Sequence, residues 1–299
     1  MARASRTSRS PGDPGPEGPP DTERLTPSRL RALAARHDIR PKRSLGQHFL
    51  IEPSLARRIV ELAEVRPGDR VVEVGAGLGS LTVTLARAGA HVVAVELDRS
   101  LVPALEEALG PSTSVRIEVA DALRADWGEL LDGPGPWKLV ANLPYNIAVP
   151  VVLRTLELEP RIERLLVMVQ REVGERLAAG PGEAQYGAVS LRVAYRAVAS
   201  AVRRVPRSVF WPQPNVDSVL VSMVRRPPPV QVEEERLWPV VREAFAQRRK
   251  TMRNALVRLG LQGDEALGLL ERCGIATSAR PEELGLPEFA CLAAEIPVR

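Results

Sequence analysis

Residues 70–80 read Arg-Val-Val-Glu-Val-Gly-Ala-Gly-Leu-Gly-Ser, an apolar run that leads directly into three closely spaced glycines. A short apolar run of this kind is typical of a buried strand, and glycines allow the chain to turn tightly where the strand ends. A helix that begins near residue 79 would leave its free N–H groups beside that turn. The stretch therefore predicts a strand, a ligand-binding turn and a helix in immediate succession.

The alternation of strand and helix patterns continues outward from this stretch. Further strands are predicted at 91–96, 115–119, 138–141 and 165–170, and helices at 27–35, 53–63, 79–88, 99–109, 126–131 and 148–157. Strands that alternate with helices indicate a parallel sheet, and their nearly continuous Val, Leu and Ile content indicates that both faces are covered. The sequence thus predicts an α/β, Rossmann-like fold with a mostly parallel sheet.

The pattern changes after residue 171. Two β-like runs, at 195–205 and 218–225, precede a stiff proline-rich linker at 226–230. Beyond it, helices are predicted at 236–247, 250–258, 264–272 and 287–294. We therefore predict three parts: a disordered Pro/Gly-rich tail over 1–25, a large α/β domain over 26–228 and a small all-helical domain over 229–299.

Composition excludes several classes of protein. The chain has 299 residues and 44 % hydrophobic residues, and no apolar run approaches the roughly 20 residues of a membrane span. Acidic residues such as Asp13 and Glu17 soon follow the Arg- and Ser-rich start, against a transit sequence, so we expect a cytoplasmic protein. Cys273 and Cys291 have no His at zinc spacing; we expect buried, inert thiols and no metal site.

Positive charge is concentrated in one segment. The whole chain has a formal net charge of +4, whereas residues 200–260 hold eleven Arg and one Lys against one Asp and four Glu, a net +7. Such a segment suits a polyanionic partner, although a solvated arginine-rich surface explains it about equally well.

Polar groups and glycine follow four successive predicted strands: Gly75, Glu96, Asp121 and Asn142. Because ligands bind at the carboxyl ends of parallel strands, we expect these residues along one binding edge. Glu96 could bind both ribose hydroxyls of a nucleoside cofactor, and Asp121 could accept from its adenine amino group. The glycine spacing is G-x-G-x-G rather than the pyrophosphate-binding G-x-G-x-x-G, which favours S-adenosylmethionine over a nicotinamide dinucleotide.

Residues 142–145, Asn-Leu-Pro-Tyr, place an amide, a rigid turn and an aromatic ring at a strand end. The Asn142 side-chain oxygen and the Leu143 carbonyl, presented by Pro144, could accept two hydrogen bonds from an exocyclic amine. The Tyr145 face could stack on the same base. The run therefore predicts a site that holds a target adenine by its amino group, with a simple strand-end turn as the alternative.

These motifs together resemble the class I methyltransferases and, within them, the ribosomal RNA adenine dimethyltransferases. The resemblance extends from about Lys42 to near the C-terminus. It is carried by residues 46–50 (Gly-Gln-His-Phe-Leu), 73–79, 95–98 (Val-Glu-Leu-Asp), 142–146, 210–218 (Phe-Trp-Pro-Gln-Pro-Asn-Val-Asp-Ser) and 245–251 (Phe-Ala-Gln-Arg-Arg-Lys-Thr). It implies the same fold, with the helical domain contributing to RNA binding.

The resemblance also implies a role for particular residues. The residues expected to contact S-adenosylmethionine are His48, Leu50, Gly75, Gly77, Glu96, Asp121 and Asn142. The family commonly has Asn at the position of His48, and a neutral imidazole has only one donor nitrogen where an amide has two N–H groups. The resemblance further implies that Phe210 approaches the target base opposite Tyr145, so that two rings stack on it.

The implied reaction is dimethylation of N6 on two adjacent adenosines in a hairpin loop near the 3′ end of small-subunit rRNA, within an immature small subunit. Hydrogen bonds to Asn142 and Leu143 would localise the amine lone pair, so catalysis would rest on positioning and electrostatics. The expected RNA-binding residues are Lys42, Arg43, Arg248, Arg249 and Lys250. We expect a monomer.

Three alternatives remain open on the sequence. The first is a large-subunit rRNA dimethyltransferase that confers macrolide resistance; those relatives usually have Ile where this chain has Leu143. The second is a ribosome-assembly binding protein for which methylation is incidental. The third is a nicotinamide oxidoreductase, which the glycine spacing disfavours.

Overall fold

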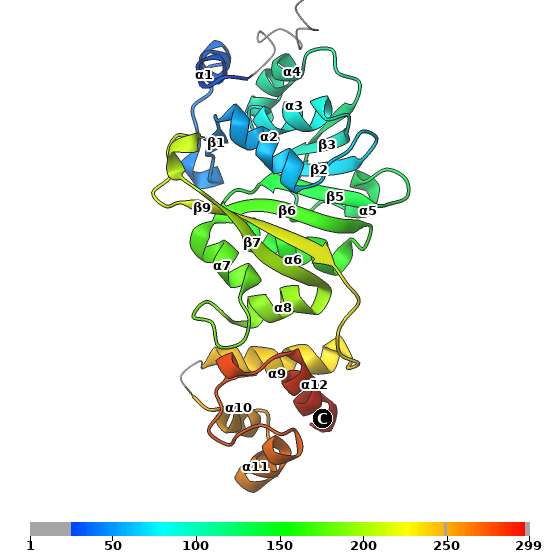
Figure 1. The fold of residues 1–299 in the computed structure, drawn as a ribbon, viewed down its shortest axis with the longest axis vertical. Helices are drawn as coiled ribbons and strands as arrows, with labels where there is room; N and C mark the ends of the chain where they lie inside the picture. Colours follow the sequence, from blue (N-terminus) through cyan, green and yellow to red (C-terminus); the bar gives the residue numbers. More distant parts are fainter. Residues whose placement is uncertain (1–24, 248–249, 297–299) are drawn as a thin grey trace, which may run out of the picture.

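The computed structural model describes residues 25–247 and 250–296, and its centre is a seven-stranded sheet. The strand order is β4-β3-β2-β5-β6-β9-β7. The five strands from β4 to β6 are parallel, whereas β9 is antiparallel to both of its neighbours. In Figure 1 the N-terminal helices lie above this sheet and the C-terminal helices lie below it. The order reverses at β2, so a crevice is expected where β2 and β5 end.

The strands of this sheet are β2 (Arg70–Val74), β3 (His91–Glu96), β4 (Val115–Val119), β5 (Trp137–Asn142), β6 (Ile162–Gln170), β7 (Ala197–Val205) and β9 (Ser218–Arg225); β1 (Phe49–Leu50) and β8 (Phe210–Trp211) form a separate pair. The helices are α1 (Pro27–Arg36), α2 (Pro53–Leu62), α3 (Ser80–Arg87), α4 (Val102–Leu109), α5 (Trp127–Leu130), α6 (Ala148–Leu158), α7 (Arg171–Ala178), α8 (Ala188–Arg196), α9 (Glu234–Ala246), α10 (Met252–Arg258), α11 (Gly263–Arg272) and α12 (Leu286–Glu295).

Helices cover both faces of the sheet, as the apolar strands require. On one face, α2 and α3 pack through residues such as Ile59 and Leu85 against Val71, Val140 and Leu166 of the strands. On the other face, α5, α6, α7 and α8 close a second core. The predicted α/β fold with a mostly parallel sheet is therefore confirmed.

Most predicted elements lie within a few residues of the observed ones, but no helix was predicted where α7 and most of α8 lie, and two further regions differ. The run at 195–205 was expected to be a strand throughout, whereas residues up to Arg196 belong to helix α8. The segment 41–50, for which no helix or strand was predicted, contains a short 3-10 turn at Arg43–Leu45 and strand β1. Strand β1 pairs with β8, with Phe49 opposite Trp211, so two segments about 160 residues apart in the sequence are joined.

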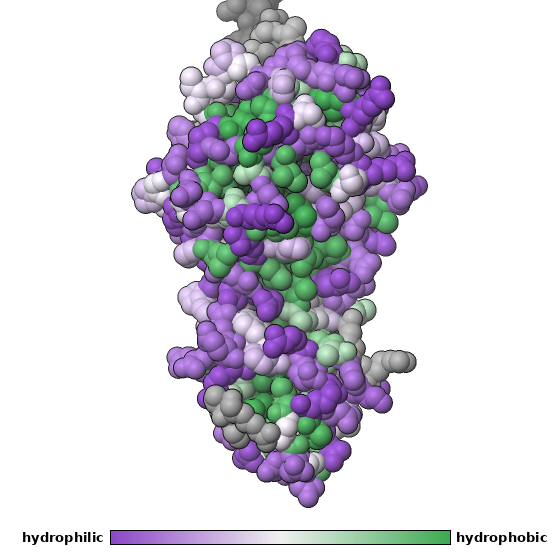
Figure 2. Space-filling model, turned by 180° about the vertical axis from the view of Figure 1, so that it is seen from behind, coloured by the Kyte–Doolittle hydropathy of each residue, from purple (hydrophilic) through white to green (hydrophobic). Residues whose placement is uncertain are grey.

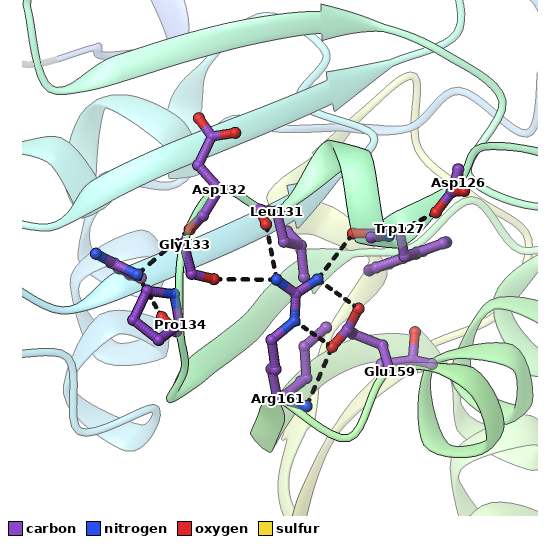
Figure 3. Close-up of polar contacts among 12 residues, drawn as sticks. Asp126, Trp127, Leu131, Asp132, Gly133, Pro134, Glu159 and Arg161 are labelled. Atoms are coloured by element: carbon purple, nitrogen blue, oxygen red, sulfur yellow. Dashed lines mark hydrogen bonds and ion pairs between the residues drawn. The ribbon is translucent and has the colours of Figure 1, made fainter.

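Arg161 ties together the loops at the amino ends of the strands. Its guanidinium donates to the carbonyls of Trp127, Leu131 and Gly133 and forms a two-point ion pair with Glu159, at 2.8 Å for both nitrogens (Figure 3). Hydrogen bonds from Arg161 lower the pKa of Glu159. Glu159 is nearly buried, so it loses its hydrogen bonds to water on folding. The charge-assisted hydrogen bonds with Arg161 replace them.

The C-terminal helices share a core with the α/β part. Leu237, Met252 and Phe289 pack in one apolar cluster with Tyr186 and Leu191, which precede β7. At the other end of the chain, Leu25, assigned to the tail by the sequence, is buried against the cluster around α1. The rest of the predicted tail, residues 1–24, lies outside the described residues.

The cysteine prediction was wrong. Cys273 and Cys291 form a disulfide that joins the end of α11 to α12, and both residues are half-buried. The sequence held no signal for this pairing, because the two residues meet only when α11 and α12 pack together.

The surface seen from behind is mostly hydrophilic, with apolar patches between the polar side chains (Figure 2). Scattered exposed apolar residues are normal on a folded protein. Within the described ranges, no helix is both long and apolar enough to cross a membrane.

Gly174 lies where α7 packs tightly against strand β9. A Cβ at this position would lie 2.1 Å from Val219 Cγ1 and 2.9 Å from Val221 Cγ2, inside the core. We expect Gly174→Ala to destabilise the protein by about 1–3 kcal/mol, because the helix must move away from β9 to relieve the overlap. Urea unfolding measures this change. Gly180→Ala, at a site with open space around it, is the matched control, and equal stability of the two variants would contradict the packing described here.

Candidate active site

A cavity of about 100 Å³ opens at the carboxyl ends of the parallel strands, at the crevice expected from the strand order. It brings together all seven residues predicted to bind the cofactor and the 142–145 run: the lining includes His48, Leu50, Gly75, Gly77, Glu96, Asp121, Asn142, Leu143, Pro144 and Tyr145. These residues come from four strand ends and from the segment that precedes α2. The prediction that the strand ends share one edge is therefore confirmed.

The glycine turn after β2 lies directly against the 142–145 run. Gly75 has a φ of +80°, and a Cβ there would lie 3.2 Å from Pro144 Cδ. A side chain would therefore both strain the backbone and push Pro144 away. The two motifs that the sequence placed separately form adjoining walls of one cavity.

Glu96 is held by the backbone at the end of β3. It is 6 % exposed; its Oε2 accepts from Gly77 N at 2.8 Å and its Oε1 accepts from Asp98 N at 2.9 Å. Burial raises the pKa of Glu96, and the two backbone N–H groups oppose that shift. A carboxylate that accepts one bond at each oxygen retains lone pairs for two hydroxyl donors. Its chemistry fits the ribose diol of a nucleoside.

Asp121 both stabilises the turn after β4 and lines the cavity. Its Oδ1 accepts from Leu123 N at 2.9 Å, which shapes the backbone after β4, and its side chain is about one-third exposed. The neighbouring Ala122 carbonyl accepts from the Trp127 indole at 3.0 Å. Asp121 is therefore placed at the rim with lone pairs available to an amino group.

Asn142 is oriented by the segment that lies across it. Its Nδ2 donates to the His48 carbonyl at 3.0 Å, so the donor half of the amide is occupied and the oxygen is the half that can accept. Leu143 N donates to Met168 O at 3.1 Å, which fixes the peptide after β5. Both acceptors proposed for a target amine, Asn142 Oδ1 and Leu143 O, thus belong to groups with a fixed position.

His48 and Tyr145 are linked to the loop after β8. His48 Nδ1 donates to Pro212 O at 2.7 Å, and Tyr145 OH and Ser218 Oγ share a hydrogen bond of 2.8 Å. The rings of His48 and Tyr145 are 5.3 Å apart between centroids. Since a carbonyl cannot donate, Nδ1 carries the proton in the neutral imidazole, and Nε2 remains an acceptor. His48 therefore supports Tyr145 on one side, whereas Ser218 holds its hydroxyl.

The position of Phe210 differs from the expectation. Phe210 is 3 % exposed and packs in the core with Leu50 and Leu220, and it does not line the cavity. The β1–β8 pairing places it opposite Leu50, with its side chain in the apolar layer. The ring that lies beside Tyr145 is that of His48. The approach of Phe210 to the target base stays a prediction.

An unpredicted residue, Asp98, fastens the segment 42–47 over the cavity. Lys42 Nζ donates to Asp98 at 2.8 Å, and Gln47 Nε2 donates to it at 2.9 Å. Although burial opposes the shift, hydrogen bonds from Lys42, Ser100 and Gln47 lower the pKa of Asp98 to about 2. Lys42, expected to bind RNA, is therefore paired within the protein, although its side chain is about half exposed. Arg43 is exposed as well. In the sequence, the only indication that Asp98 matters was its place at the end of the family-like run 95–98.

The remaining predicted RNA-binding residues lie in the C-terminal helical part. Arg248 and Arg249 are outside the described residues, and Lys250 is exposed just before α10. For the described part of the chain, no group of His, Cys, Asp or Glu could hold a metal ion.

Glu73, in the glycine motif, is a fully buried carboxyl whose Oε2 has no hydrogen-bond partner. Burial raises its pKa to about 8. Between the unfolded value of about 4.5 and this value, the folded protein keeps a proton that the unfolded chain releases, so stability falls as pH rises. We expect Glu73 to lower the free energy of unfolding by up to about 1.4 kcal/mol per pH unit over this window.

Glu73→Gln keeps the shape of the side chain and removes its titration. Urea unfolding between pH 5 and pH 8 measures the effect as the difference in pH slope between wild type and variant. We expect the wild type to lose stability relative to Glu73→Gln as pH rises. Parallel curves would mean that Glu73 is already ionised in the folded protein.

The seven-stranded order, the glycine turn at the switch point and the acid at the end of β3 define a class I methyltransferase fold with a cavity at the strand ends. Comparison with known proteins identifies the family within this class. The family model for ribosomal RNA adenine dimethylase matches residues 39–291, and the chain belongs to this family.

Its relatives include two bacterial proteins named ribosomal RNA small subunit methyltransferase A. The one from Thermobifida fusca is 49 % identical over 283 residues, which cover 93 % of this chain and 98 % of the relative. The one from Streptomyces griseus is 48 % identical and covers 91 % of this chain and 95 % of the relative. The resemblance inferred from the motifs is thereby confirmed.

Solved structures confirm the fold. A dimethyladenosine transferase from Plasmodium falciparum superposes with a TM-score of 0.69 at 22 % identity, covering 82 % of this chain and 96 % of that one. The 23S rRNA methyltransferase ErmE gives a TM-score of 0.65 at 26 % identity, covering 82 % of this chain and 98 % of that one. This chain is thus much more similar in sequence to the small-subunit enzymes than to ErmE.

Proposed function

We propose that the protein dimethylates N6 of two adjacent adenosines in the 3′-terminal hairpin loop of small-subunit (16S) rRNA, with S-adenosylmethionine as methyl donor. The observation that carries the proposal is the fixed pair of acceptors, Asn142 Oδ1 and Leu143 O, on the wall shared with the glycine turn. Family membership and identities of 48–49 % to small-subunit enzymes support the choice of rRNA.

The donor set of the cavity fits the cofactor. Glu96 would bind the ribose hydroxyls, Asp121 the adenine amino group, and the turn at Gly75 and Gly77 would let the backbone approach closely. His48, Leu50 and Asn142 would complete the contacts from the other wall. When bound, S-adenosylmethionine supplies an electrophilic methyl group on a sulfonium.

The protein's own residues act on the amine. Two hydrogen bonds from the target N6 to Asn142 Oδ1 and Leu143 O would draw its lone pair out of conjugation with the ring. Tyr145 would stack on the base, with Pro144 fixing the turn between them. No described side chain is needed as a base, because the proton can leave to water after transfer. The monomethylated amine retains one N–H, so a second transfer in the same cavity is feasible.

Membership of the rRNA adenine dimethylase family also supports a proposal about the partner of the protein and its place in the cell. We infer that the protein works as a monomer in the cytoplasm on an immature small ribosomal subunit, without a metal ion. Lys42, Arg43 and Lys250 are the exposed, described members of the RNA-binding set inferred from the sequence, and Lys42 is also paired with Asp98.

Methyl transfer to purified ribosomal subunits tests the proposal. We expect label from S-adenosylmethionine to enter unmethylated small subunits and not large subunits. Transfer to large subunits alone would support the macrolide-resistance alternative. Binding of small subunits without any transfer would support an assembly protein, and binding of NAD in place of S-adenosylhomocysteine in calorimetry would indicate an oxidoreductase.

A further inference from the structure

Strand β7 is the outer strand of the sheet, and its end next to the active site is basic. Arg203 and Arg204 are both exposed, and among the described residues neither has a carboxylate partner. Arg207, two residues beyond the strand, is also exposed; its side chain donates only to Asn215 O, at 3.3 Å. Three cationic side chains thus lie within five residues, and none forms an ion pair among the described residues, although the Asp217 carboxylate accepts from Arg207 N at 3.1 Å.

The other arginines of the same region behave differently. Arg196 is paired with Glu234, Arg225 donates to main-chain carbonyls including Leu156 O at 2.9 Å, and Arg226 donates to Ala194 O. These side chains fasten one part of the fold to another. Arg203 and Arg204, by contrast, have no hydrogen-bond or ion-pair partner elsewhere in the described fold, and Arg207 contacts only its own loop.

The strand register spreads these charges around the edge. A bulge at Val202 shifts the pairing of β7 with β9, so that Arg203 lies opposite Leu220 and Arg204 opposite Val219. Leu220 and Val219 belong to the cores on opposite faces of the sheet. Arg203 and Arg204 therefore flank the strand on its two sides.

The same register places the arginines beside the active site. Val205, the next residue of β7, lies opposite Ser218, whose hydroxyl is bonded to Tyr145 OH. At about 3.4 Å per residue, Arg204 and Arg203 follow roughly 3.4 and 7 Å further along the strand. Arg207 begins the segment that runs through β8 to Pro212, the partner of His48.

We propose that Arg203, Arg204 and Arg207, the arginine edge, bind the phosphates of the nucleotides that flank the adenosine held at Tyr145. The proposal rests on the proposed function, because it needs an RNA substrate. Arginine binds phosphate at two points and keeps its charge at all relevant pH values, so it is suited to binding the RNA backbone. A base stacked on Tyr145 leaves its neighbouring phosphates close to the Ser218 end of β9, where the arginine edge lies.

The test is the salt dependence of RNA binding by Arg203→Ala/Arg204→Ala. Binding of wild type and variant to unmethylated small subunits and to a naked hairpin RNA is measured at several salt concentrations. Two lost phosphate contacts should reduce the slope of log K against log salt by about 1.4 for both RNAs. The KM for small subunits should rise on the order of 10-fold at physiological salt, with kcat at saturating substrate unchanged.

Arg66 provides the control. It is exposed and precedes β2, at the opposite end of the strands from the cavity. The single variants Arg204→Ala and Arg66→Ala remove the same charge, and only Arg204→Ala should change the slope. S-adenosylhomocysteine affinity should be the same for all variants, which shows that each one is folded.

Two results would overturn the proposal. An unchanged salt slope for the double variant would mean that the arginine edge does not meet phosphate. Weaker binding to subunits with unchanged binding to the naked hairpin would indicate an acidic ribosomal protein as the partner. Failure of the proposed function is a separate outcome, because the wild type itself would then transfer no methyl group to the small subunit.

Discussion

Asn142→Ala is expected to reduce methyl transfer by at least about 100-fold at saturating substrates, the typical effect of losing one positioned polar group. The amide oxygen is the acceptor fixed by the Nδ2 bond to His48 O. RNA affinity should change little, because phosphate contacts supply most of it. Single-turnover transfer to small subunits, with RNA binding measured in parallel, checks both expectations.

A matched change far from the cavity controls for folding. Asn254 also donates its amide nitrogen in a hydrogen bond, to Thr251 Oγ1 at 3.1 Å in the C-terminal helices. Asn254→Ala should keep nearly full turnover at saturating substrates. Near-normal turnover of Asn142→Ala would refute the proposed polarisation of the amine.

Glu96→Ala should weaken S-adenosylmethionine binding by about 2–4 kcal/mol. The variant loses two hydrogen bonds from the ribose to a charged group, each contributing roughly 1.5–3 kcal/mol before losses of cooperativity. It also removes the acceptors of Gly77 N and Asp98 N, so the glycine turn and the 95–98 segment lose their common anchor. Calorimetry with S-adenosylhomocysteine and with the methyl donor measures the change.

Glu96→Gln separates the two contributions to this effect. An amide retains an acceptor for one backbone N–H group but binds a diol less well than a carboxylate. We expect its affinity to fall between those of wild type and Glu96→Ala. If Glu96→Ala binds the cofactor as tightly as wild type, the assignment of the β3 end to the ribose is wrong.

Local sequence patterns were sufficient to predict the sheet and the cavity. Val71, Val72 and Val74 form a strand because they are buried on both faces, and Gly75 must follow because its φ is positive and Pro144 lies against it. Glu96 and Asn142 were found in the same way, since the end of a parallel strand is visible in the sequence. Their convergence follows from the topology of parallel strands alone.

Contacts between distant segments could not be predicted. The two-residue strand β1 is too short for a periodic pattern and exists only because β8 pairs with it. The burial of Phe210, the support of Tyr145 by His48 and the fastening of Lys42 by Asp98 all depend on how the segments before α2 and after β8 cross the sheet edge. The sequence also could not show which arginines are exposed. The +7 segment contains arginines that join parts of the fold as well as those of the arginine edge.

The central claim is tested most directly by nucleoside mass spectrometry of small-subunit rRNA after incubation with the protein and S-adenosylmethionine. We predict N6,N6-dimethyladenosine at two adjacent positions of the 3′-terminal hairpin loop with the wild type, and almost none with Asn142→Ala over the same time. Absence of dimethyladenosine from wild-type reactions, or its appearance only in large-subunit rRNA, would contradict the account.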